Sequence, residues 1–84
     1  MLKLKIVTPE KIAFDGEVIS VLVPGTMGQF EILNGHAPII SSLGKGIVEY
    51  ATNEGKRQVA VSGGFVAVQH NEVSLCVEID EVTE

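Results

Sequence analysis

The sequence predicts an all-β protein, a two-sheet β-sandwich of about ten short strands. Apolar and polar residues alternate with a period of two through most of the chain, as at Leu2, Leu4 and Ile6, which are separated by two lysines. Turn-forming residues recur roughly every six to ten positions, a spacing typical of sandwiches. Apolar residues nowhere repeat at helical spacing over three turns, so no helix is expected.

Turn signals divide the chain into the expected strands. The strand at 2–6 is half-buried and ends before Thr8-Pro9. Asp15-Gly16 is a strong hairpin signal, which predicts a turn between strands at 12–14 and 17–23. Pro24-Gly25 is expected to stop the second of these, and Gly63-Gly64 to break the chain later. The remaining expected strands are 46–51, 58–62, 65–69 and 72–79.

The segment 24–46 concentrates five glycines, two prolines and a histidine around the short apolar runs 30–33 and 38–43. Glycine and proline weaken regular structure, so the segment is expected to form shaped loops presented by a sheet. Such loops leave some apolar side chains exposed for a partner. Ile32 is expected to fill the core instead, whereas Met27 and Phe30 are expected to face an interface.

Composition indicates a single domain, residues 1–84, that is too small for a large core. A hydrophobic content of 45% excludes a disordered chain, and a net charge of −5 argues against nucleic acid as the main partner. No apolar run approaches the roughly 20 residues that span a bilayer, and the N-terminus has no continuous apolar stretch. The chain is therefore expected to be cytoplasmic and to meet a membrane only through a partner. Its last four residues, 81–84, are expected to fray.

The sequence offers no clear catalytic or metal-binding site. Cys76 is the only cysteine, and it lies in a regular strand without a helix N-terminus to activate it. His36 and His70 sit among turn residues and lack a metal-binding spacing, so neither a metal nor a cofactor is expected. A small hydrolase built on Cys76 or a histidine stays as an alternative, since such partners need only be close in space.

Charge is uneven along the chain, with basic residues near the start and acidic residues near the end. If the first and last strands are neighbours, Lys3 and Lys5 are expected to pair with Glu78 and Asp80 across the strands. Two separately solvated faces are the alternative.

Several motifs, in order, resemble the epsilon subunit of the F-type ATP synthase, specifically its N-terminal β-sandwich domain. Together they cover nearly the whole chain, and the Gly-His-Ala-Pro and Ser-Gly-Gly-Phe pieces at this spacing are specific. The matching stretches are Leu-Lys-Ile-Val-Thr-Pro-Glu (4–10), Phe-Asp-Gly-Glu-Val (14–18), Val-Pro-Gly-Thr-Met-Gly (23–28), Ile-Leu-Asn-Gly-His-Ala-Pro (32–38), Val-Ser-Gly-Gly-Phe-Val (61–66) and Asn-Glu-Val-Ser-Leu (71–75).

The resemblance implies two five-stranded sheets that rotate within the central stalk of a proton-translocating ATP synthase. It implies a non-catalytic subunit that clamps the gamma subunit to the c-ring, peripherally at the cytoplasmic face of the bacterial plasma membrane. Carried over by position, the residues facing the c-ring would be Met27, Gly28, Gln29, Phe30 and Glu31. Those near gamma would be His36, Ala37, Pro38, Ser41 and Ser42.

The sequence departs from the family in several places, which include Asn34 where the family usually has proline, and two of the departures bear on function. The family commonly has an acidic residue where this chain has Gln29, and Glu31 could supply that charge from the same face. Most members also continue into a two-helix hairpin that can inhibit ATP hydrolysis, whereas this sequence stops at Glu84. A chain of that natural length would couple and assemble without this brake; for a piece of a longer protein, nothing about regulation follows. An unrelated β-sandwich that binds another protein is the alternative function.

Overall fold

In the computed structural model, which describes residues 1–80, the chain forms eight β-strands and no helix. The expected frayed end, 81–84, lies outside the described residues. The all-β prediction is confirmed, with somewhat fewer strands than expected. The strands are β1 (Leu2–Val7), β2 (Ile12–Val18), β3 (Ser20–Gly25), β4 (Gly28–Leu33), β5 (Ile39–Leu43), β6 (Gly46–Thr52), β7 (Gly55–Gln69) and β8 (Glu72–Ile79).

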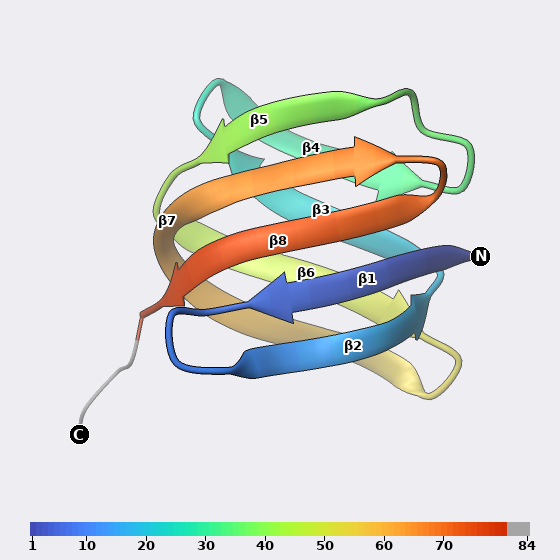
Figure 1. The fold of residues 1–84 in the computed structure, drawn as a ribbon, viewed down its shortest axis with the longest axis horizontal. Coiled ribbons are helices and arrows are strands. Elements are labelled where there is room, and N and C mark those ends of the chain that lie inside the picture. Colours follow the sequence, from blue (N-terminus) through green and yellow to red (C-terminus); the bar gives the residue numbers. More distant parts are fainter. Residues whose placement is uncertain (81–84) are drawn as a thin grey trace.

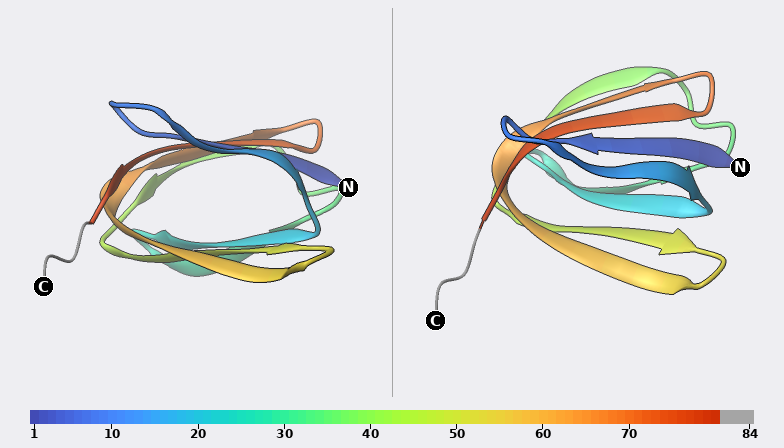
Figure 2. Two further views of the ribbon diagram at one scale, coloured as in Figure 1. Left: turned by 90° about the horizontal axis from the view of Figure 1, so that it is seen from below. Right: turned by 60° about the horizontal axis from the view of Figure 1, so that its bottom comes forward.

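The strands form two layers that enclose the core (Figures 1 and 2). One layer has the order β2, β1, β8, the second half of β7, then β5. The other has the order β4, β3, β6, then the first half of β7. The layers therefore have five and four strands, rather than the five and five that the resemblance implied. The long strand β7 curves from one layer into the other.

Inward-facing side chains of both layers fill the core, as strand alternation requires. Ile32 is fully buried, which confirms its expected place in the core. Phe14 of β2 reaches across to Tyr50 of β6, with ring centroids 4.7 Å apart, and so links the two layers. The buried residues are Leu2, Leu4, Ile6, Val18, Val21, Val23, Ile32, Leu43, Val48, Tyr50, Val61, Val66, Val68, Val73, Leu75 and Val77.

The hairpin expected at Asp15-Gly16 is not formed. Both residues lie inside β2 and pair with Lys5 and Leu4 of β1. The turn that joins β1 to β2 comes earlier, where the Thr8 hydroxyl donates to the carbonyl oxygen of Lys11 and accepts from its N–H. A side chain on residue 16 would press on the Phe14 ring, at 3.2 Å from its Cζ atom. Gly16 therefore makes room for an aromatic ring, not for a turn.

The single strand expected over 17–23 is divided at Ile19. Val18 and Val21 are both fully buried although three positions separate them, so the alternation changes phase between them. At that point the chain leaves β2 in one layer and enters β3 in the other. Pro24-Gly25 was expected to stop this strand earlier, but both residues still pair with β4 as the last two of β3.

Gly63-Gly64 bends the chain without ending the strand. Before this point β7 pairs with β6, and after it with β5, while β8 accompanies it across the bend. The register with β8 shifts between Val61 and Gly63, which marks a β-bulge. A bulge increases the local twist and redirects a strand, so the glycine pair re-aims β7 between the layers. The prediction of two separate strands here was wrong.

The first and last strands are neighbours, as the charge argument supposed, but the expected ion pairs are absent from residues 1–80. Strands β1 and β8 run parallel, so Lys3 lies opposite Glu72 and Lys5 opposite Ser74. Glu78 lies beyond the end of that pairing, and the carboxylate of Asp80 approaches the Lys45 ammonium instead, at 3.7 Å. Lys3 and Lys5 would meet Glu78 and Asp80 only in an antiparallel arrangement, in which the start of one strand lies opposite the end of the other.

Candidate interaction surface

The segment 24–46 is more regular than expected. It contains two strands, β4 and β5, joined to their neighbours by a tight hairpin at 26–27 and a loop at 34–38. The hairpin tip is tied to β5, because the Thr26 N–H donates to the carbonyl oxygen of Ser42 at 3.1 Å. Met27 lies at this tip and is 99% exposed. An apolar side chain this exposed is available for a partner.

The five residues expected at the c-ring do not form one uniform face. Gln29 and Glu31 are both exposed and lie two positions apart on one side of β4, as expected. Phe30 points to the other side, where it is half-buried and packs against the core. Phe30 is therefore accessible to a partner only through the exposed part of its ring. Met27 and Gly28, at the hairpin tip, are exposed.

The residues expected near gamma lie on the loop and on β5. Ala37, Pro38 and Ser42 are exposed, and His36 and Ser41 are half-buried. The His36 ring lies 6.5 Å from the Phe30 ring, centroid to centroid, so the loop folds back beside β4. Its Nδ1 atom is 2.7 Å from the carbonyl oxygen of Ala37, which fixes the ring orientation.

A shallow hollow of about 420 Å³ between the hairpin and β5 is lined by residues expected at the c-ring and by one residue expected near gamma. Ser41, which was expected near gamma, lines this hollow together with four of the residues that were expected at the c-ring. Sequence reasoning missed Ile39, which also lines it, and Ile40, which is 80% exposed on the opposite side of β5. The sequence did contain a signal for this exposure. Two consecutive isoleucines in a strand point to opposite sides, so both cannot face the core. The hollow is lined by Gly25, Met27, Gly28, Gln29, Phe30, Ile39 and Ser41.

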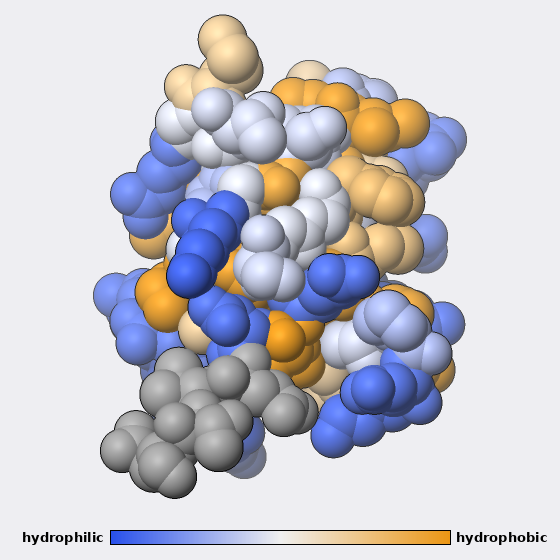
Figure 3. All heavy atoms as spheres, turned by 90° about the vertical axis from the view of Figure 1, so that its left-hand side faces the viewer, coloured by the Kyte–Doolittle hydropathy of each residue, from blue (hydrophilic) through white to orange (hydrophobic). Residues whose placement is uncertain are grey.

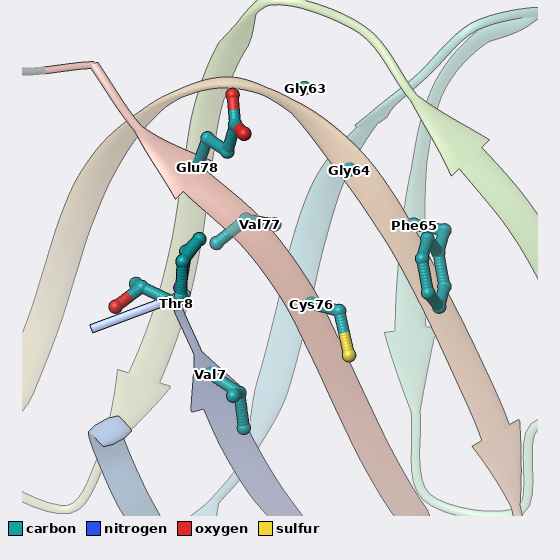
Figure 4. A pocket seen from close by; sticks show the side chains of 9 residues that line it. Val7, Thr8, Gly63, Gly64, Phe65, Cys76, Val77 and Glu78 are labelled. Carbon is teal, nitrogen blue, oxygen red and sulfur yellow. The ribbon is translucent and has the colours of Figure 1, made fainter. Parts of the chain in front are cut away.

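A second hollow, of about 510 Å³ and mainly apolar, opens on the outer face of the five-stranded layer (Figure 4). Val7, Cys76 and Phe65 project there from three neighbouring strands, β1, β8 and β7. The end of the molecule where β7 bends carries apolar patches that alternate with hydrophilic ones (Figure 3). Sequence reasoning missed Phe65, since nothing local tells which of Phe65 and Val66 faces the core.

The hydrolase alternative finds no support at Cys76. Neither histidine lines the hollow into which Cys76 opens, so the structure does not form the Cys–His pair that this alternative requires. No Asp, Glu, Lys, Arg or His among residues 1–80 is buried, and no three of His, Cys, Asp or Glu gather there to hold a metal ion. The same residues contain no helix long and apolar enough to cross a membrane.

The fold and this surface define a two-layer β-sandwich domain whose β4–β5 side presents a hairpin tip, a loop and exposed apolar side chains. Residues 1–81 match the protein family described as the ATP synthase delta/epsilon chain, β-sandwich domain. The chain belongs to this family, which confirms the resemblance seen in the sequence.

Curated relatives and a solved structure support the same family assignment. The ATP synthase epsilon chain of Leptospira interrogans is 43% identical over 77 residues, which cover 92% of this chain and 61% of the relative. That of Chlorobium limicola is 42% identical over 90% of this chain and 88% of its own length. A chain in the Euglena gracilis mitochondrial ATP synthase, solved with OSCP, F1 and c-ring, superimposes with a TM-score of 0.88 at 25% identity, over 98% of this chain and 56% of that chain. This chain spans about three-fifths of the length of the Leptospira relative.

Proposed function

We propose that this chain is a non-catalytic subunit of the central-stalk rotor of a proton-translocating F-type ATP synthase, where it couples the gamma subunit to the c-ring. The observation that carries the proposal is the family match over residues 1–81. The exposed β4–β5 side supports it, because a coupling subunit needs surface for two partners. An unrelated β-sandwich binding module is not favoured, since it would not share this family's sequence pattern.

The proposed mechanism is mechanical. The hairpin tip with Met27, Gly28 and Gln29 would rest on the c-ring, with Glu31 and the exposed part of Phe30 beside it. The loop and β5, with His36, Ala37, Pro38, Ser41 and Ser42, would face gamma. Strand β7 runs through both layers, so the two layers are joined by one continuous backbone as well as by the core. Such a joint resists sliding of one layer over the other, as torque transmission requires.

The proposed location follows from the complex. The subunit would lie peripherally at the cytoplasmic face of the bacterial plasma membrane, attached through the c-ring and gamma. Its relatives in Leptospira and Chlorobium are bacterial, which supports that placement. No chemistry is assigned to Cys76 or to either histidine.

Binding to gamma is tested with Ser42→Arg, which places a long cation on the exposed side of β5. We expect the purified chain to bind the gamma subunit encoded in the same genome, and this variant to raise the Kd by about tenfold or more, because a bulky charge must be desolvated in the interface. Isothermal titration gives the Kd. The matched control is Asn53→Arg, in the exposed β6–β7 turn on the opposite side of the sandwich. Absence of binding by the unmodified chain at micromolar concentrations would overturn the proposal.

Binding to the c-ring is tested with Met27→Glu. A carboxylate in place of the exposed apolar tip is expected to lower the affinity for detergent-solubilised c-ring, alone or with gamma bound, by about tenfold, because burying an unpaired charge is unfavourable. Biolayer interferometry on immobilised c-ring measures it. Asn53→Glu adds the same charge elsewhere and should bind as the unmodified chain does. Equal affinities for the two variants would remove the hairpin tip from the c-ring contact.

A further inference from the structure

The turn between β7 and β8 meets the β4–β5 loop through one side chain. The Oδ1 atom of Asn71 accepts a hydrogen bond from the Gly35 N–H at 2.7 Å, across 36 positions of sequence. Among residues 1–80, no other side chain from outside the loop hydrogen-bonds to its backbone. This contact therefore links two exposed segments that the sequence alone does not bring together.

The turn holds Asn71 in a defined orientation. His70 and Asn71 both have positive φ, 52° and 61°, as in the tight hairpin turns that match strand twist. Asparagine adopts this conformation more readily than most residues. The Lys3 N–H also donates to the Asn71 carbonyl oxygen at 2.8 Å, which fastens the turn to β1. The turn conformation and the bond to β1 therefore hold the Asn71 Oδ1 atom in place.

The loop has few other restraints of its own. Residues 34, 35, 37 and 38 are exposed, and the local backbone bond runs from the His36 N–H to the Leu33 carbonyl oxygen at 3.0 Å. Gly35 has φ +84°, a conformation that glycine enters and leaves freely. Segments with little buried contact open easily. The Asn71 bond is placed at the residue of the loop with the greatest backbone freedom.

We propose that Asn71 is a positioning residue that holds the loop of His36, Ala37 and Pro38 in the conformation that docks on gamma. The inference rests on the proposed function. A loop that is ordered before binding avoids the entropy loss of ordering it in the complex, so a partner binds more tightly. Loss of the bond should therefore weaken gamma binding without unfolding the sandwich.

The test compares Asn71→Gly with His70→Gly. Both substitutions place glycine at a positive-φ position of the same turn, so both keep the turn conformation, and only the first removes the acceptor. We expect the Gly35 amide to exchange with solvent about tenfold faster in Asn71→Gly, and the Kd for gamma to rise about three- to tenfold, the equivalent of one hydrogen bond. His70→Gly should change neither, and both should melt at similar temperatures. Asn71→Asp keeps an acceptor oxygen and should restore much of the affinity.

Each possible result supports or overturns the positioning role of Asn71. Equal exchange at Gly35 and equal Kd for the two glycine variants would overturn the role of Asn71. Faster exchange with an unchanged Kd would show that the bond exists but does not position the loop for gamma, which also overturns it. If the unmodified chain fails to bind gamma, the proposed function falls, and the inference with it. That outcome is recognised separately, because it appears before any variant is compared.

Discussion

Replacing Gly64 with alanine is expected to lower the free energy of unfolding by about 3–5 kcal/mol. Gly64 has φ +145°, which side-chain-bearing residues rarely adopt. An added Cβ would also collide with the carbonyl oxygen of Cys76 and lie 2.8 Å from the Cα of Val77, both of them backbone atoms of the paired strand. Backbone cannot move aside here without breaking the β7–β8 ladder.

Urea unfolding followed by circular dichroism measures this loss. For a domain of this size the expected change corresponds to a fall in melting temperature of more than about 12 °C. Gly63→Ala is the matched control, because its Cβ would meet the Leu43 carbonyl oxygen at an ordinary 3.6 Å. It should cost less than about 1 kcal/mol. Similar losses for the two variants would show that the bend does not depend on the conformation of Gly64.

Ile32→Ala is expected to destabilise the domain by about 2–5 kcal/mol, since it removes a fully buried side chain between the layers and leaves a cavity. Met27→Ala, five positions earlier, should change the stability by no more than about 0.5 kcal/mol, because Met27 is almost wholly exposed. Thermal unfolding of both variants under the same conditions makes the comparison. Ile32→Val should fall between them, at about 0.5–1.5 kcal/mol.

This pair separates the two kinds of apolar residue in the segment 24–46. Core residues are expected to matter for folding, and exposed ones for binding a partner. A small effect of Ile32→Ala would mean that β4 packs loosely on the core. A large effect of Met27→Ala would mean that the hairpin tip supports the fold, which would weaken its assignment to the c-ring.

The alternation in the sequence was sufficient for the fold class and for much of the core. Leu2, Leu4 and Ile6 in β1, and Val73, Leu75 and Val77 in β8, are buried as their period of two predicts. A strand that buries one face must alternate in this way, so the pattern is local and can be read directly. The motifs likewise sufficed for the family, since they preserve spacing along nearly the whole chain.

The candidate surface was only partly predictable. The exposure of Met27 and the burial of Ile32 followed from their places among turn residues and strand residues. The contact between Asn71 and Gly35 and the exposure of Phe65 did not, because each depends on which strands become neighbours. Such contacts join residues distant in sequence, and no local signal marks them.

What the sequence by itself determined was an all-β sandwich of this family, with its core faces and an exposed segment at 24–46. Only the tertiary structure decided where strands continue or turn. Asp15-Gly16 reads locally as a hairpin, and Gly63-Gly64 as a break, yet both lie within strands. Hydrogen bonds to β1 in the first case, and to β5 and β8 in the second, hold these glycines in the sheet. Glycine permits a turn, but the pairing of distant strands determines whether one forms.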